Sequence, residues 1–179
     1  MHLEPPDPGL DHFERLGLPR EWRVSRDALQ QAYVSRSREV HPDRFAGGSE
    51  QVQARARTHA SLLNEAYQVL RDRVGRAAYL VKLAGFDLEQ AGREGGAPAP
   101  SQAFLLEMME RRDAAEALTE DGQREALLDE VEAERAQTFA AAVEHLESGA
   151  FEDAARALLV LRYLDRFVES LEEALDKAG

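Results

Sequence analysis

The 179-residue chain has no cysteine and no long apolar run, and 20 of its 22 basic residues are arginine. The absence of cysteine excludes disulfides, thiolate zinc sites, cysteine-ligated iron–sulfur clusters and a cysteine nucleophile. No apolar stretch approaches the ~20 residues that a membrane-spanning helix needs. The first residues, 1–8, contain neither a basic stretch nor an apolar region, so they do not resemble a secretory signal. These absences predict a cytoplasmic protein without a membrane segment.

The composition is typical of folded helices, with 44% hydrophobic and 31% charged residues. The net charge of −12 is unevenly distributed. Residues 1–100 contain 14 basic and 14 acidic side chains, whereas residues 101–179 contain 8 basic and 20 acidic ones. Because an acidic surface repels phosphates, we do not expect the second half to bind nucleic acid.

Helix-start and helix-stop signals divide the first half into helices. Asp11, with Glu14 three residues later, forms a capping box that begins the first helix. Ser25 and Ser49 cap a second and a third helix. Pro42 ends the second helix, because the residue before proline is disfavoured in the α region. A short polar loop then predicts an antiparallel hairpin, followed by a shorter helix near residues 75–83.

The second half is also predicted to be helical, which makes the fold class all-α. Three apolar-periodic segments, at residues 101–118, 123–148 and 151–177, predict a three-helix bundle. A stretch rich in Gly, Ala and Pro precedes them and reads as a linker. The predicted organisation is an N-terminal extension at residues 1–10, a first domain at 11–84, a linker at 85–100 and a C-terminal bundle at 101–179.

The triplet His41-Pro42-Asp43 stands at the tip of the predicted hairpin. Proline fixes the turn, so that the histidine and the aspartate project from a rigid corner toward a partner. The alternative interpretation is purely structural: His41-Pro42 ends the helix, Asp43 caps the next turn, and the triplet binds no partner. A metal site is not predicted, because two ligands are too few and the other histidines lack ligand spacing. Neither oxyanion donors nor a Gly-rich phosphate cradle accompanies the triplet, so we expect no enzyme and no cofactor.

The flanks of the triplet resemble the J-domain family across residues 11–83. Tyr33 lies eight residues upstream of the triplet, and the following helix contains Asn64-Glu65-Ala66-Tyr67. The resemblance implies that the corner and the arginines beside it contact the ATPase domain of a DnaK-type chaperone and stimulate its ATP hydrolysis. Arg36 departs from the family, which usually has an apolar residue there. The implied chaperone-binding residues are Tyr33, Arg36, Arg38, His41, Pro42, Asp43 and Arg44.

Further motifs are similar to those of the HscB family, the co-chaperones of iron–sulfur cluster assembly. The Gly/Phe-rich and Cys-rich modules of general DnaJ proteins are absent, as is the N-terminal Cys-x-x-Cys module of eukaryotic relatives. The resemblance implies two partners, the DnaK-type chaperone HscA and the scaffold protein IscU, and no metal. It rests on His41–Phe45, Arg76–Leu80, Gly85-Phe86-Asp87, Phe104–Glu110 and Leu161–Asp165.

The predicted fifth helix has two apolar stripes. Phe104, Met108, Ala115 and Leu118 form one, the natural core face. The other, formed by Leu105, Leu106 and Met109, favours a client surface; the alternative is a helix buried between two neighbours.

In the HscB family this region binds the scaffold, and Asp113 and Tyr163 here replace the family's Glu and Phe. The implied scaffold-binding residues are Leu105, Leu106, Met109, Glu110, Asp113, Arg162 and Tyr163.

The sequence therefore predicts an adaptor that delivers an iron–sulfur scaffold protein to a DnaK-type chaperone. One alternative is a specialised J-domain protein that serves the general DnaK with a different client. From other classes, a standalone helical regulator and a small metal-dependent enzyme stay open.

Overall fold

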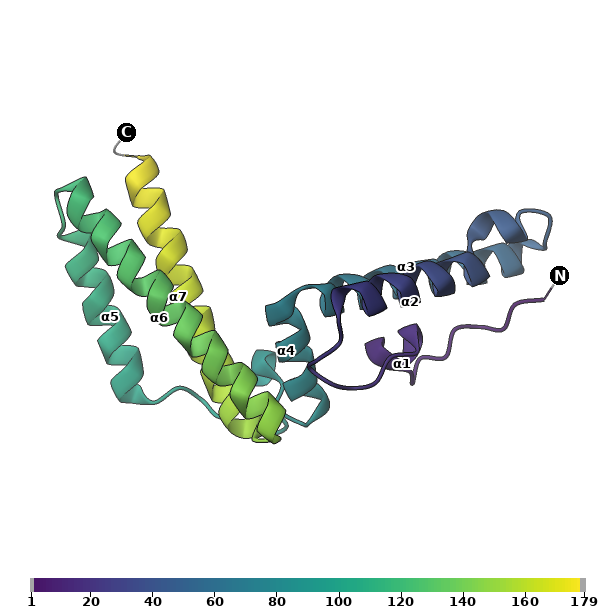
Figure 1. Ribbon diagram of the computed structural model, residues 1–179, viewed down its shortest axis with the longest axis horizontal. Coiled ribbons are helices and arrows are strands. Elements are labelled where there is room, and N and C mark those ends of the chain that lie inside the picture. Colours follow the sequence, from purple (N-terminus) through teal and green to yellow (C-terminus); the bar gives the residue numbers. More distant parts are fainter. Residues whose placement is uncertain (1, 178–179) are drawn as a thin grey trace. The chain divides into compact units, whose positions relative to one another are not determined.

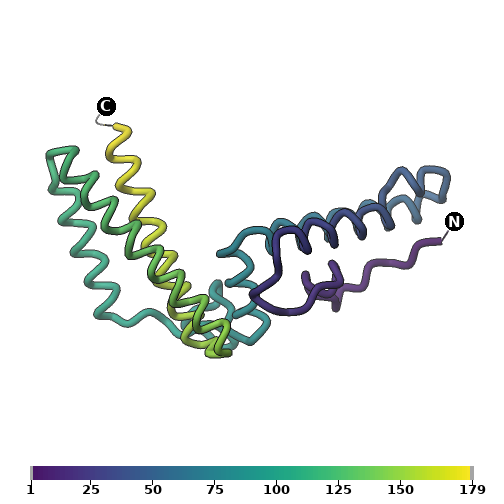
Figure 2. The backbone as a smooth tube through the Cα atoms, in the orientation of Figure 1, coloured from purple at the N-terminus to yellow at the C-terminus, as the bar shows by residue number. Residues whose placement is uncertain are grey.

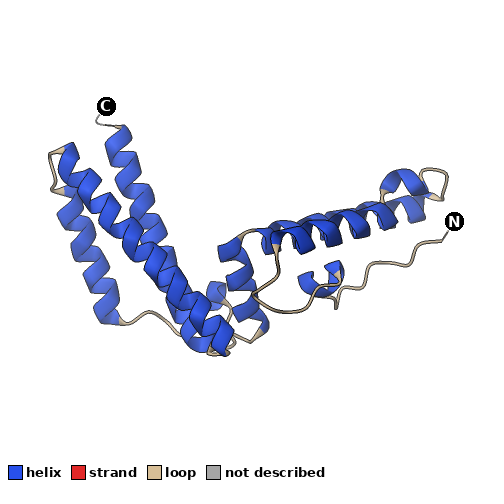
Figure 3. Ribbon diagram, in the orientation of Figure 1, coloured by secondary structure: helices blue, strands red, loops and turns tan. Residues whose placement is uncertain are grey.

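A computed structural model describes residues 2–177, and their regular structure is helical (Figure 1, Figure 3). Over this range there is no β-strand, only an isolated bridge between Asp87 and Gly96. No helix within the same residues is long and apolar enough to cross a membrane. The chain forms two compact units that divide between Leu80 and Val81. The all-α prediction is confirmed.

The first unit is built on a helical hairpin. Helices α2 and α3 lie side by side and antiparallel, as Figure 2 shows, and the short α1 packs against α3. One turn of 3₁₀ helix occupies part of the predicted loop at the tip. The elements are α1 (His12–Leu16), α2 (Arg26–Val40), η1 (Pro42–Phe45), α3 (Glu50–Arg71) and α4 (Arg73–Leu83), the last of which crosses the boundary between the units.

Side-chain caps begin the first three helices where the sequence predicts them. The Asp11 carboxylate accepts the Glu14 backbone N–H at 2.9 Å, and Glu14 accepts that of Asp11 at 2.9 Å. Ser25 accepts the backbone N–H of Ala28 at 3.1 Å. Because these caps satisfy N–H groups that have no partner inside the helix, they fix where each helix begins.

A buried arginine joins the start of the fourth helix to the loop before α2. Arg76 is only 9% exposed and donates from Nη1 to the carbonyl oxygen of Val24 at 2.7 Å. Its guanidinium carbon lies 4.8 Å from the centre of the Trp22 ring. Burial lowers the pKa of the Arg76 guanidinium below its ordinary value. These contacts give a structural role to the arginine of the Arg76–Leu80 motif.

The second unit contains the predicted three-helix bundle, which is confirmed. Helices α6 (Asp121–Ser148) and α7 (Phe151–Asp176) lie side by side, with Gly149 in the left-handed region at φ 77° between them. Helix α5 (Gln102–Glu116) packs its inner face onto this pair. Met108 and Ala115 of α5 join a buried cluster with Val131, Leu164, Phe167, Val168 and Leu171.

The predicted linker, residues 85–100, folds back on itself rather than extending. Asp87 caps a short 3₁₀ helix, η2 (Leu88–Gln90), and its carbonyl oxygen accepts the Ala97 N–H at 3.0 Å. Leu88 and Ala97 are buried. Gly96 has no room for a side chain, because a Cβ there would lie 1.9 Å from the carbonyl oxygen of Gln90. The segment therefore belongs to the packed part of the second unit.

Candidate functional site

His41, Pro42 and Asp43 form an exposed corner at the tip of the hairpin. Pro42 begins η1, and His41 has the extended backbone (φ −57°, ψ 129°) that a following proline favours. The Asp43 backbone N–H donates to Nδ1 of His41 at 3.3 Å, which leaves Nε2 as the ring atom available to a partner. The side chains of His41 and Asp43 are 56% and 92% exposed. The corner thus presents an imidazole and a carboxylate to solvent on a fixed turn.

The residues after the corner hold it in place. Phe45 is 7% exposed and packs in a cluster with Val52 and Ala56 of α3. Gln53 donates from Nε2 to the carbonyl oxygens of Ala46 and Gly48 at 3.0 and 3.1 Å. Because α3 supplies both an apolar anchor and a hydrogen-bonding clamp, the loop is preorganised before any partner arrives.

Arg44 closes the end of α2. Its Nη1 donates to the carbonyl oxygens of Arg38 and Glu39 at 3.0 and 3.4 Å, which have no acceptor role inside the helix at this end. A cation at a helix C-terminus is also favoured by the helix dipole. Arg44 therefore has a structural role besides its positive charge, whereas Arg38 makes no ion pair with the described residues.

A shallow groove runs along the outer face of α2 beside these arginines. It is lined by Gln30, Gln31, Val34, Ser35, Arg38, Glu39 and Arg44. Sequence reasoning did not single out Gln31 and Val34. Each lies four residues before another residue of the lining, Gln31 before Ser35 and Val34 before Arg38, which places each pair on one side of the helix.

The structure separates Tyr33 and Arg36 from that face. The Tyr33 hydroxyl donates to Oδ1 of Asn64 at 2.5 Å, and its ring stacks on Tyr67 of α3 at 4.4 Å between centres. The Arg36 side chain lies against Gly17 at the end of α1. It is so close that a Cβ added to Gly17 would lie 2.9 Å from Nη2 of Arg36. It also pairs with Glu39 at 3.3 Å and is 47% exposed. Both side chains therefore contact neighbouring helices of their own unit.

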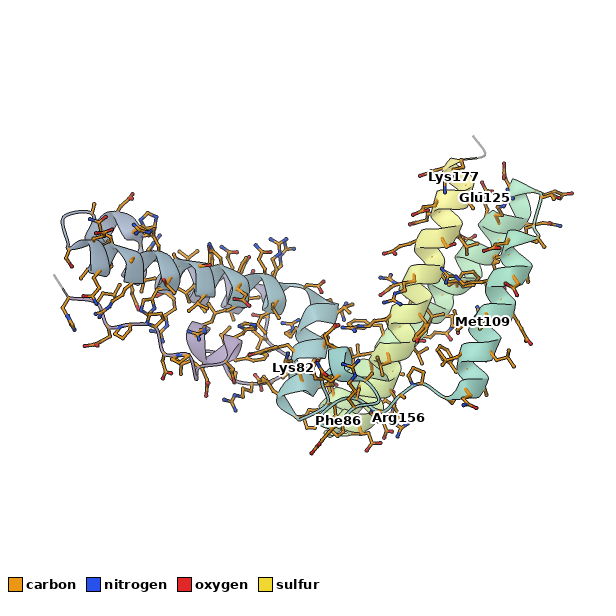
Figure 4. All side chains as sticks on the ribbon, turned by 180° about the vertical axis from the view of Figure 1, so that it is seen from behind. Lys82, Phe86, Met109, Glu125, Arg156 and Lys177 are labelled. Atoms are coloured by element: carbon orange, nitrogen blue, oxygen red, sulfur yellow. The ribbon has the colours of Figure 1, made fainter. Side chains whose placement is uncertain are left out.

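The second stripe of α5 is exposed. Leu106 and Met109 are 57% and 62% exposed, and Figure 4 marks Met109 on this helix. Glu110 and Asp113 are exposed beside them, and Leu105 is half-buried. The inner stripe behaves differently, since Met108 is 6% exposed. Within the part of the chain that the structure describes, helix α5 is therefore not buried between two neighbouring helices.

A groove between α5 and α7 continues this surface. The Tyr163 ring meets Phe104 edge-on, with 5.4 Å between the ring centres. Arg112 and Arg166, which sequence reasoning missed, also line the groove; no apolar pattern marks them. The full lining is Leu105, Met108, Met109, Arg112, Tyr163, Arg166 and Phe167.

Arg162 lies outside this groove. Its Nη2 pairs with the Glu89 carboxylate of η2 at 2.6 Å, and the arginine side chain is 36% exposed. Of the two α7 residues predicted to bind the scaffold, the structure brings Tyr163, but not Arg162, into the groove with Leu105 and Met109.

Within residues 2–177, no group of three or more His, Asp or Glu side chains is arranged to hold a metal ion. The described features are instead those of a recognition protein: a helical hairpin with an exposed His-Pro-Asp corner, and a separate bundle with an exposed apolar stripe. The first of these defines the class of J-domain proteins.

Comparison with known families supports this class and narrows it. The family model described as "DnaJ domain" matches residues 11–79, and "HSCB C-terminal oligomerisation domain" matches residues 100–172. A co-chaperone protein HscB homolog of Burkholderia thailandensis is 38% identical over 158 residues, which are 87% of this chain and 88% of the relative. A co-chaperone protein HscB homolog of Cupriavidus taiwanensis is 34% identical over 170 residues, which are 93% of this chain and 94% of the relative. The chain belongs to the HscB family of J-domain co-chaperones.

Solved structures share the fold. Chaperone HscB from Vibrio cholerae has a TM-score of 0.73 and 26% identity, over 95% of this chain and all 100% of the other. Human co-chaperone protein HscB has a TM-score of 0.77 and 26% identity, over 96% of this chain and 85% of the other. The Jac1 co-chaperone of Saccharomyces cerevisiae, at 17% identity and a TM-score of 0.59, shows the fold alone; the match covers 86% of this chain and 88% of Jac1.

Proposed function

We propose that this protein is an adaptor of iron–sulfur cluster assembly: it binds an IscU-like scaffold protein, delivers it to an HscA-like DnaK-type chaperone and stimulates that chaperone's ATP hydrolysis. It acts through these partners in the cytoplasm, without enzymatic activity or a cofactor of its own. The observation that carries the proposal is the preorganised, solvent-exposed corner at His41 and Asp43 on a chain of the HscB family.

The first unit is suited to an acidic chaperone surface. Arg38 and Arg44 stand beside the corner and line a groove whose other residues include a single acidic side chain, Glu39. Positive charge there steers association and favours the correct orientation of the encounter. A corner that is already fixed loses little conformational freedom on binding.

The second unit is suited to a folded client. The exposed stripe of Leu106 and Met109 offers apolar contacts, and the flexible thioether adapts to the shape of the partner. Two exposed large apolar side chains one turn apart are typical of a recognition surface rather than of a solvated helix face.

The test is a single-turnover assay of ATP hydrolysis by the purified chaperone, with and without the scaffold protein. We expect His41→Gln to abolish stimulation while scaffold binding, measured by calorimetry, stays unchanged. His145→Gln, which replaces a histidine of α6, is the matched control and should stimulate normally. Normal stimulation by His41→Gln would refute the proposal.

The alternative, a J-domain protein for the general DnaK and another client, is tested in the same assay. Substituting DnaK for the HscA-like chaperone, and a generic unfolded client for the scaffold, should give weak stimulation that is not enhanced by the client. Stronger stimulation of DnaK would favour the alternative.

A further inference from the structure

The arginines of the C-terminal helical bundle differ in whether they form an ion pair. Helices α5, α6 and α7 carry seven arginines, and among the described residues five of them form an ion pair with a carboxylate. These pairs are Arg111–Glu134, Arg124–Asp121, Arg135–Asp165, Arg156–Glu152 and Arg162–Glu89. The two that form none with residues 2–177 are Arg112 and Arg166.

Both of these arginines line the same groove, one from each wall. Arg112 belongs to α5 and Arg166 to α7, and the same lining contains Leu105, Met109 and Tyr163. The surroundings are acidic, since residues 101–179 contain 20 acidic and 8 basic side chains. The groove therefore combines two positive charges with an otherwise apolar and aromatic lining, on a unit that is negative overall.

We propose that the groove receives a carboxylate of the scaffold protein, from an Asp or Glu adjacent to an apolar side chain. The apolar side chain contacts Leu105 and Met109, and the carboxylate lies between Arg112 and Arg166. This inference rests on the proposed function, which assigns the scaffold to this face. Guanidinium groups suit the role, because they bind carboxylates through two parallel hydrogen bonds and are weakly hydrated.

The same charge arrangement selects against wrong partners. A segment with Lys or Arg at this position would meet two like charges, and a purely apolar segment would desolvate them without compensation. The arginines thus add specificity to an apolar contact that is itself permissive.

The experiment compares Arg112→Gln, Arg166→Gln with Arg156→Gln, which removes an exposed arginine that is already paired within the chain. The probe is the purified IscU-like scaffold, titrated by calorimetry at low and at high salt. We expect the double variant to lose about tenfold or more in affinity at low salt and to show a weaker salt dependence. The control should stay within about twofold of the original chain.

Three outcomes would overturn the inference, and they differ from one another. If the double arginine variant binds normally while Leu106→Ala, Met109→Ala does not, no carboxylate is received but the proposed function stands. If neither variant affects binding, the proposed scaffold site fails as well. If light scattering shows that the arginine variant instead abolishes self-association, the groove is an interface between copies of this chain.

A second, independent observation concerns the N-terminal segment of the first unit. Leu3 packs against the cluster of Phe45, Val52 and Ala56 that anchors the loop after Asp43. Its carbonyl oxygen accepts from Arg55 Nη1 at 2.9 Å, and that of Glu4 lies 3.0 Å from Nε2 of His59. The segment is therefore attached to α3 by both apolar and polar contacts.

We infer that residues 2–8 act as a strap that positions the His41-Pro42-Asp43 corner. Leu3 packs against the cluster that contains Phe45, so replacing Leu3 with a polar residue should expose this anchor and loosen the turn that ends at Phe45. Leu3 is thus a positioning residue, one step removed from the chaperone contact.

The test is Leu3→Ser, with Leu10→Ser as the control, because Leu10 is 41% exposed and belongs to no Phe45 cluster. Amide hydrogen exchange should accelerate severalfold at residues 43–48 and not in α2, and stimulation of the chaperone should fall by a similar factor. Leu3→Met should restore both. Unchanged exchange at residues 43–48, or acceleration spread over the whole unit, would overturn the inference whatever the fate of the proposed function.

Discussion

The sharpest prediction concerns the double change Leu106→Ala, Met109→Ala on the outer stripe of α5. These side chains are 57% and 62% exposed, so less than half of each is shielded from water in the free protein. Full burial of a Leu or Met side chain is worth about 1.5–3 kcal/mol. Truncation should therefore cost about 1 kcal/mol or less of folding free energy at each position, and alanine favours the helix.

The expected effect on scaffold binding is much larger. Truncating a side chain at the centre of an interface typically costs about 1–3 kcal/mol. Two such losses should weaken binding by about ten- to more than a hundredfold, because each 1.4 kcal/mol is a factor of ten. Leu106 is preferred to Leu105 for this test, since Leu105 is half-buried and its truncation would mix binding with stability.

The assay measures scaffold affinity by calorimetry and stability by thermal unfolding for the same variants. The control is Met108→Ala on the inner stripe, at a residue 6% exposed, which should lose about 2–5 kcal/mol of stability. The reasoning is wrong if the outer-stripe variant unfolds as easily as Met108→Ala, or if it binds the scaffold with unchanged affinity.

Three further predictions follow from the described contacts. Arg38→Ala should reduce chaperone stimulation mainly at low salt, whereas Arg44→Ala should reduce it at every ionic strength, because the α2 end also loses its cap; stimulation assays across a salt series distinguish the two. Gly96→Ala should destabilise the second unit by about 1–3 kcal/mol in thermal unfolding, since its Cβ would meet a backbone carbonyl. Hydrogen bonds from Lys82 and the Glu89 N–H lower the pKa of the Asp87 carboxyl, so its stabilisation is present above the ordinary carboxyl pKa and is lost as the pH falls through the lowered value; Lys82→Met should reduce this acid-dependent part of the unfolding curve.

The helices of this protein could be predicted because their boundaries are set locally. Asp11 and Ser25 accept backbone N–H groups three residues ahead, and Pro42 excludes the helical conformation of the residue before it. Such signals need no knowledge of distant residues. The exposed corner and the two stripes of α5 could be predicted for the same reason, as both follow from short-range geometry.

Contacts between distant residues could not be predicted. The attachment of Leu3 beside Phe45 joins positions that are far apart in sequence, and neither residue carries a local mark of it. The folding-back of residues 85–100 depends on Leu88 and Ala97 being buried, although the composition of the segment is that of a flexible linker.

The predicted chaperone-binding residues of α2 do not all lie on one side of that helix. The sequence predicts Tyr33 and Arg36 as chaperone-binding residues together with Arg38, since all three lie on the second helix, but at about 100° per residue Tyr33 and Arg36 lie on a different side of it from Arg38. A helical wheel containing Leu29, which is buried, assigns Tyr33 and Arg36 to the inner side, so this division was accessible from the sequence. The lack of an ion pair at Arg112 and Arg166 among residues 2–177 could not be predicted, because it depends on where every carboxylate of the bundle lies.

Under the proposed function, the His41 corner and the outer stripe of α5 should differ in how they affect the rates of association and dissociation. The His41 corner is fixed before binding by Phe45 and Gln53, and the charges beside it are exposed, so under the proposed function we expect fast, electrostatically steered association. The α5 surface, through Leu106 and Met109, gains its binding energy from apolar burial, which acts mainly on the dissociation rate. Under the proposed function we therefore expect the α5 surface to set how long the scaffold stays bound, and the charges beside the His41 corner to set how fast the chaperone associates.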